Sequence, residues 1–154
     1  MQTTAYFRGP IEETMALLVE ARTFMMETEW WDRQKVDGVK GLRITNETFR
    51  LTSRLTQVMS WLMFQRAVHN GEISAEYAME DQFRLSGHDV CLDTSHCNDA
   101  VISDELRSLL NRSHKLFLRI ERLETSFART ATRYPPSSNN EELDANFGHA
   151  EPEH

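Results

Sequence analysis

The chain has 154 residues, of which 40% are hydrophobic and 27% are charged, and its formal net charge is −7. This length supports one domain with a real core and excludes two ordinary domains. Six glycines and four prolines are too few for the frequent turns of a β-sandwich, so the composition favours an all-α fold. Residues 135–154 carry −5 of the net charge and the rest of the chain has no basic block, which argues against a nucleic-acid-binding protein.

No segment of the sequence is predicted to direct export or to cross a membrane. Residues 1–10 lack an apolar core, and no apolar run approaches the roughly 20 residues that span a bilayer. The two cysteines, Cys91 and Cys97, do not form a disulfide framework, so we expect a cytoplasmic protein.

The first predicted helix begins at Gly9-Pro10, because proline is tolerated at the first helical position. Residues 1–8 are expected to be frayed. Apolar residues then recur at intervals of three and four up to the end of the helix near Trp30-Trp31. The glycines in residues 32–43 predict a loop.

The second predicted helix is apolar on more than one side. Thr45 or Asn46 can cap it, and it runs to about Val68. Asn70-Gly71 ends it, because both residues accept the left-handed conformation of a helix C-terminus. A helix this apolar in so small a chain is expected to be covered by other helices on one side and by a second chain on the other.

A short helix is predicted over residues 75–85 with Ser74 as its cap, followed by a polar loop over residues 86–102. The last helix begins at Ser103 or Asp104, and its heptad-like spacing is the strongest periodic signal in the chain.

Pro135-Pro136 stops this last helix. The sequence therefore predicts an antiparallel three-helix bundle over residues 1–134, with one short extra helix and a dimeric state. Residues 135–154 are predicted to be a disordered acidic tail.

One cluster has residue types suited to a metal, namely His88, Cys91, His96 and Cys97. Zinc binds thiolate and imidazole, but the spacing His-x2-Cys-x4-His-Cys matches no usual structural zinc pattern. An ordinary polar loop is the favoured interpretation, and no metal or cofactor is predicted.

Ser113-His114-Lys115 weakly resembles the phospho-accepting site of two-component signalling, which leaves a histidine phosphotransfer protein as the alternative function. The chain has no nucleophile-elbow, P-loop or dinucleotide fingerprint, so catalytic residues are not predicted and an enzyme is not expected. Aromatic residues near arginine are typical of binding hot spots. Trp30, Trp31, Trp61 and Phe64 are candidates, although Trp61 and Phe64 also suit a helix core.

The segment over residues 49–85 resembles the RcdA family (regulator of CtrA degradation), an alphaproteobacterial family also described as a domain of unknown function. The likeness is carried by Phe-Arg-Leu-Thr-Ser-Arg-Leu-Thr-Gln-Val-Met-Ser-Trp-Leu, Gln-Arg-Ala-Val, Gly-Glu-Ile and Arg-Leu in this segment. The last helix is similar to that family's last helix in its Leu-Leu-x-x-Ser and Arg-x-x-x-Leu pattern. The resemblance covers roughly residues 11–130.

The resemblance implies a non-enzymatic adaptor that helps deliver cell-cycle regulatory proteins to the ClpXP protease. RcdA-like proteins are dimeric three-helix bundles with a flexible C-terminal tail. The implied partners are a second copy of the chain, the ClpX protease complex, a response-regulator adaptor and cargo transcription factors. Nucleic acid and membrane are not among them.

The residues that match the family's motif are candidates for partner or dimer contact, but the motif also allows them only to hold the bundle together. The matching residues are Arg54, Gln57, Ser60, Trp61, Gln65, Arg66, Arg84, Ser113 and Arg119. The candidates taken from them are Arg54, Gln57, Trp61, Gln65, Arg66 and Arg84. Phe64, Trp30 and Trp31 join them as aromatic candidates.

Overall fold

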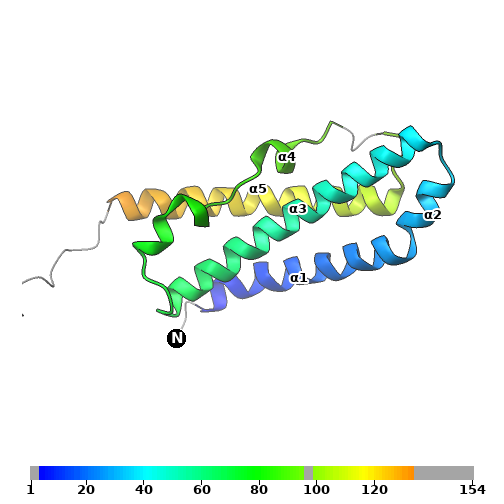
Figure 1. Ribbon diagram of the computed structural model, residues 1–154. Helices are drawn as coiled ribbons and strands as arrows, with labels where there is room; N and C mark the ends of the chain where they lie inside the picture. Colours follow the sequence, from blue (N-terminus) through cyan, green and yellow to red (C-terminus); the bar gives the residue numbers. More distant parts are fainter. Residues whose placement is uncertain (1–3, 96–98, 134–154) are drawn as a thin grey trace, which may run out of the picture.

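The computed structural model describes residues 4–95 and 99–133, and within these residues every regular element is helical (Figure 1). The all-α prediction is therefore confirmed. The elements are α1 (Thr4–Glu27), α2 (Glu29–Gln34), α3 (Gly38–His69), the 3-10 turns η1 (Tyr77–Met79) and η2 (Asp81–Phe83), α4 (His88–Leu92) and α5 (Asp104–Arg133).

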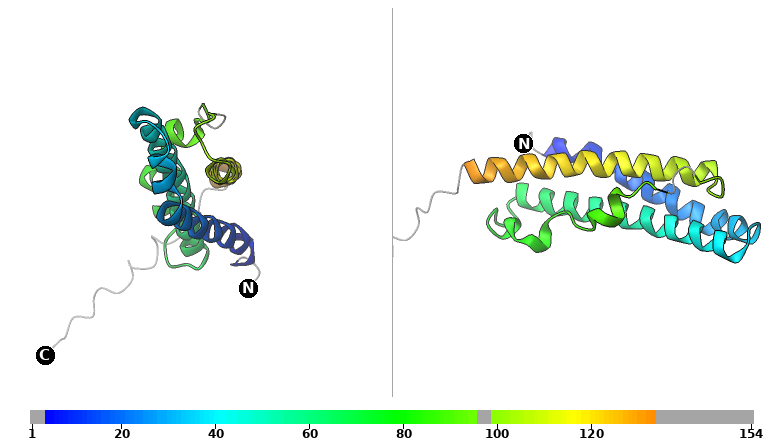
Figure 2. Two further views of the ribbon diagram at one scale, coloured as in Figure 1. Left: turned by 90° about the vertical axis from the view of Figure 1, so that its right-hand side faces the viewer. Right: turned by 90° about the horizontal axis from the view of Figure 1, so that it is seen from above.

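The three long helices α1, α3 and α5 run side by side along the molecule (Figure 1 and Figure 2). α1 is antiparallel to α3, because the ring of Phe7 near the start of α1 lies 4.9 Å from that of His69 at the end of α3. α1 is also antiparallel to α5, since Phe7 lies 6.1 Å from Phe127 near the end of α5, whereas Glu20 pairs with Arg112 near its start.

α3 and α5 consequently point in the same direction, so within the predicted antiparallel bundle α1 runs against both of the other long helices. The physical reason is the connection over residues 70–103, which carries the chain back along the bundle before α5 begins (Figure 1). This return segment includes η1, η2 and α4, and it packs on α3 and α5.

The core lies between the three long helices, each of which buries one apolar side. α1 contributes Phe7, Leu17, Ala21 and Phe24. α3 contributes Ile44, Leu51, Leu55, Val58, Trp61 and Leu62. α5 contributes Leu106, Leu109, Leu110, Leu116, Phe117 and Ile120. The predicted heptad-like stripe of the last helix is thus the buried side of α5.

Both α1 and α3 begin earlier than the sequence predicted. α1 starts at Thr4 with Pro10 inside it, because buried Phe7 packs against α3 and α5 and holds the turn before the proline in place. α3 starts at Gly38, because Asp37 is its N-cap and the Asp37 carboxylate accepts the backbone N–H of Lys40 at 2.9 Å.

The first predicted helix also ends earlier than expected, at Glu27, and Trp30 and Trp31 lie on the separate helix α2, but two other boundaries agree with the sequence. α3 stops at Asn70-Gly71 with Gly71 at φ +74°, as predicted, and Ser103 caps α5 by accepting the N–H of Leu106 at 3.3 Å. The single short helix predicted over residues 75–85 is instead the two turns η1 and η2.

The segment predicted as a polar loop over residues 86–102 contains α4. Gly87 precedes that helix with a φ angle of +70°, a backbone conformation that residues other than glycine rarely adopt. The tail predicted over residues 135–154 lies outside the described residues. Over the described part of the chain, no helix combines the length and apolarity that crossing a membrane requires.

Candidate interaction surfaces

Arg54, a motif residue of α3, is completely buried and ties the return segment to the bundle. Its Nε donates to the carbonyl of Cys91 at 2.5 Å and its Nη2 to that of Asp93 at 2.8 Å. Its Nη1 donates to the carbonyl of Leu110 in α5 at 3.2 Å. This one guanidinium of α3 thereby binds α5 as well as the C-terminal end of α4.

Arg50, one helical turn before Arg54, strengthens the same junction. Its guanidinium donates to the Asp93 carboxylate at 2.9 Å, to the Val90 carbonyl at 3.1 Å and to the buried Glu47 carboxylate at 2.5 Å. The second carboxylate oxygen of Glu47 has no hydrogen-bond partner within the described residues. Both arginines therefore lie on the side of α3 that packs against the return segment and α5, which we call the inner side of α3.

Gln57 and Trp61 lie on the same inner side of α3 as Arg54. The Gln57 side-chain carbonyl accepts hydrogen bonds from Ser86, from its N–H at 3.2 Å and its hydroxyl at 3.0 Å. The Trp61 indole is almost fully buried and stacks on Phe127 of α5 at 5.9 Å. In this structure both residues hold the return segment and α5 against α3.

Phe64 fixes the next part of the return segment, because its ring stacks on that of Phe83 in η2 at 4.0 Å. Phe83 also lies 4.8 Å from the exposed ring of Tyr77 in η1. Gln65 and Arg66 are half-buried near the end of α3. These contacts explain why residues 75–85 form tight turns rather than a helix.

Arg84, Trp30 and Trp31 are the predicted candidates that reach solvent. Arg84 is exposed, and it lies 3.9 Å from the carboxylate of Asp81 and 4.0 Å from that of Glu124. Trp30 and Trp31 on α2 meet edge to face at 4.6 Å, and both remain exposed. α2, which carries both residues, lies between α1 and α3 at one end of the bundle (Figure 1).

A different surface appears on the outer side of α3. Leu42, Phe49 and Met63 are 61%, 68% and 42% exposed and are spaced by multiples of seven residues. Seven residues return almost to the same side of a helix, so the three side chains share one stripe. This stripe lies about half a turn around α3 from the buried side that contains Val58.

α1 carries a comparable stripe of exposed apolar residues, Met15, Val19 and Met26, which is interrupted by exposed Arg22. α1 and α3 touch where the Met25 sulfur lies 4.0 Å from the Thr52 hydroxyl, and α1 pairs with α5 through its other side. Both stripes therefore flank the α1–α3 contact on the side away from α5. We call this surface the α1–α3 apolar face, and it comprises Met15, Val19, Met26, Leu42, Phe49 and Met63.

The solvent side of α5 has the opposite chemistry. Its basic residues recur at intervals of three, four or seven, so they form one exposed stripe along the helix. We call it the α5 basic stripe, and it comprises Arg112, Lys115, Arg119, Arg122, Arg129 and Arg133. The stripe was not predicted, because its residues form no contiguous basic block in the sequence; the helical spacing of the Lys and Arg residues is the signal that indicates it.

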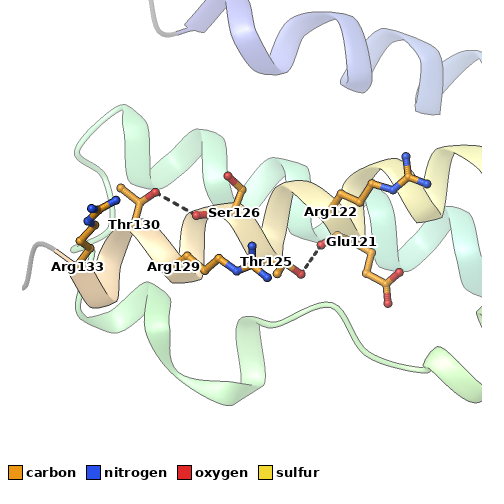
Figure 3. A pocket seen from close by; sticks show the side chains of 7 residues that line it. All are labelled: Glu121, Arg122, Thr125, Ser126, Arg129, Thr130 and Arg133. Atoms are coloured by element: carbon orange, nitrogen blue, oxygen red, sulfur yellow. Dashed lines mark hydrogen bonds between the residues drawn. The ribbon is translucent and has the colours of Figure 1, made fainter.

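Arg122, Arg129 and Arg133 line an open groove of about 600 Å³ along α5 (Figure 3). The hydroxyls of Thr125 and Thr130 in this groove each donate to a backbone carbonyl of their own helix at 3.0 Å. The guanidinium groups are consequently the main donors that the groove offers to a ligand.

The α5 basic stripe is paired with α1 at two positions. Arg112 forms an ion pair with Glu20, and Arg119 forms one with Glu13. The hydrogen bond from Arg112 holds the pKa of Glu20 below its ordinary range. The other four cations of the stripe make no ion pair within the described residues.

Two of the residues weighed for metal chemistry, His88 and Cys91, lie on α4. Cys91 is buried, and burial raises the pKa of its thiol, while His88 lies 3.3 Å from the Glu121 carboxylate. His96 and Cys97 lie outside the described residues. Among the residues that the structure describes, no group of three or more His, Cys, Asp or Glu side chains is placed to hold a metal ion.

His114, the residue behind the phosphotransfer alternative, is half-buried. Its pKa is lowered by burial and by the charge of Arg54, although a hydrogen bond to the Leu92 backbone opposes this shift. A ring held in this way is not the freely exposed imidazole that a phosphotransfer site requires.

Comparison with known proteins identifies a family and a similar solved structure. The family model described as "Protein of unknown function (DUF1465)" matches residues 2–147. The fold is similar to the crystal structure of RcdA from Caulobacter crescentus CB15, with a TM-score of 0.62 and 29% sequence identity over 88% of this chain and 97% of that chain. No curated protein matches the chain.

Proposed function

The chain belongs to the DUF1465 family, and from this membership and its likeness to RcdA we propose that it is a non-enzymatic adaptor of regulated proteolysis. In this role it helps deliver cell-cycle regulatory proteins to the ClpXP protease in the cytoplasm. A response-regulator adaptor primes the protease, and cargo transcription factors bind the dimeric bundle. The adaptor itself needs no cofactor.

The observation that carries the proposal is the likeness to RcdA, which extends over nearly the whole of both chains. An adaptor acts by bringing substrate and protease together, so it needs accessible surfaces of different chemistry. The α1–α3 apolar face and the α5 basic stripe are two such surfaces. Linking two weak contacts in one assembly can raise avidity by ~10²–10⁴ without any new contact.

The test is a degradation assay with purified ClpXP, the response-regulator adaptor and a candidate cargo protein. Adding this chain should shorten the half-life of the cargo only when the primed protease is present. A pulldown from cytosolic extract should recover ClpX and the response regulator. If the chain neither binds the primed protease nor changes the degradation rate of any cargo, the adaptor function is refuted.

We further propose that the α1–α3 apolar face is the homodimer contact. Contiguous exposed apolar patches are rare on monomeric proteins and mark interaction sites. Phe49→Glu should convert the dimer to a monomer, because it would bury an unpaired carboxylate in the interface. The measurement is sedimentation equilibrium.

Val90→Glu is the matched control, since Val90 is also an exposed apolar residue but lies on α4, which packs on the inner side of α3. It should leave the dimer intact. A Phe49→Glu chain that remains dimeric would reject this face, and a monomeric wild-type chain would reject the homodimer itself.

A further inference from the structure

The α5 basic stripe is a charged helix side that the described residues only partly neutralise. Lys115, Arg122, Arg129 and Arg133 are exposed and make no ion pair within residues 4–95 and 99–133. Three of these cations line the groove along the last three turns of α5 (Figure 3). Arginine donors in such a row suit carboxylates of an extended acidic segment.

The same chain contains an acidic segment directly after this stripe. Residues 134–154 include five Asp or Glu residues and no Lys or Arg. The acids are Glu141, Glu142, Asp144, Glu151 and Glu153. All 17 Lys and Arg residues of the chain precede Pro135, so charge is separated sharply at the end of α5.

The chain length allows these two segments to meet. Glu141 follows Arg133 by eight residues, which span up to about 28 Å when extended. The stripe from Arg112 to Arg133 is about 31 Å long at the helical rise of 1.5 Å per residue. Pro135-Pro136 follow the stripe almost directly in the sequence, and proline disfavours the continuation of a helix.

We propose that the acidic segment over residues 141–153 binds in cis to the α5 basic stripe. Glu141, Glu142 and Asp144 face the cations at the end of α5, and the last two acids reach those nearer its middle. Exposed ion pairs are individually weak and are screened by salt. Several of them act together here, at the millimolar effective concentration that a short tether provides.

This arrangement gives the tail a definite role. A partner with an acidic segment must displace the tail before it can use the α5 basic stripe. The tail also shields a row of cations from non-specific polyanions. The inference is independent of the proposed adaptor function.

The experiment places a nitroxide spin label on the tail of the full-length chain. The chain carries Cys97→Ser and Ala145→Cys, and buried Cys91 does not take the label because burial raises its pKa. Backbone amides over residues 112–133 should be broadened by the label at an ionic strength of about 0.01 M. The broadening should disappear at about 1 M, where the Debye length is only about 3 Å.

Two pairs of substitutions test which cations are responsible. Arg122→Gln with Arg129→Gln should reduce the broadening several-fold. Lys35→Gln with Lys40→Gln removes the same charge at the other end of the bundle and should leave it unchanged. Both pairs alter exposed side chains, so the fold should persist, and circular dichroism checks this directly.

Three results would overturn the proposal. The first is an absence of broadening along α5 at low salt, and the second is broadening that survives Arg122→Gln with Arg129→Gln. The third is broadening that appears only between copies, when a labelled chain is mixed with an isotope-enriched unlabelled one. This last result would assign the tail to a neighbouring molecule rather than to its own helix.

Discussion

Replacing Arg54 is the sharpest test of how this bundle holds its return segment. The side chain is completely buried, and its guanidinium donates to the carbonyls of Cys91, Asp93 and Leu110. Arg54→Ala would leave these carbonyls without their donors and a cavity where the side chain was. α4 should then detach from α3 and α5 before the bundle as a whole unfolds.

The expected loss is about 3–5 kcal/mol of unfolding free energy. Hydrogen bonds to a charged group contribute about 1.5–3 kcal/mol each, and buried unsatisfied carbonyls carry penalties of similar size. The full sum is not reached, because removing Arg54 also removes the desolvation penalty of a buried cation. With a typical total stability of 5–15 kcal/mol, this change still removes a large fraction.

The assay is urea unfolding at a fixed protein concentration, because the proposed homodimer would make stability depend on concentration. At an m-value of about 2 kcal/mol/M, the midpoint of Arg54→Ala should fall by about 1.5–2.5 M. Arg43→Ala is the control, since Arg43 is a half-exposed surface arginine that pairs with Asp99 at 2.9 Å. That change should alter the free energy by less than about 1 kcal/mol. A loss below about 1 kcal/mol in Arg54→Ala would refute the reasoning.

Three further predictions concern buried groups. Burial lowers the pKa of His114, so the unfolded chain binds a proton at this residue more readily than the folded chain does. The free energy of unfolding should therefore be highest above about pH 6.5 and decline below it. In urea titrations, His114→Gln should flatten that decline. Burial raises the pKa of Cys91, so in a Cys97→Ser chain the remaining thiol should react with a disulfide reagent only on unfolding. Leu62→Asp places a carboxylate in the core and should cost several kcal/mol, and an unchanged melting temperature would contradict the packing of α3.

The sequence predicts those parts of the fold that depend on local signals. The stop at Asn70-Gly71 and the cap at Ser103 follow from side-chain and backbone chemistry within a few residues. The buried side of α5 follows from periodicity. The starts of α1 and α3 were predicted too late. α1 begins before Pro10 because Phe7 packs against α3 and α5. The start of α3 was missed because Asp37-Gly38 has the composition of a turn, although Asp37 caps the helix.

The candidate surfaces could be predicted only in part, for a physical reason. α3 is apolar on two sides, and periodicity cannot tell which side faces the bundle until α1 and α5 are placed. Phe49 and Leu51 both have the character of core residues, yet Leu51 is buried and Phe49 is 68% exposed. The return segment was equally unpredictable, because its path depends on distant partners such as Arg54 and Gln57.

The distribution of the motif residues has a consequence for where partners bind. Arg54, Gln57 and Trp61 carry much of the sequence resemblance, and all three contact the return segment or α5 from the inner side of α3. These three motif residues therefore hold the bundle together, whereas Arg84, another motif residue, is exposed. The α1–α3 apolar face and the α5 basic stripe lie on different helices and differ in chemistry, so the two surfaces suit partners of different kinds.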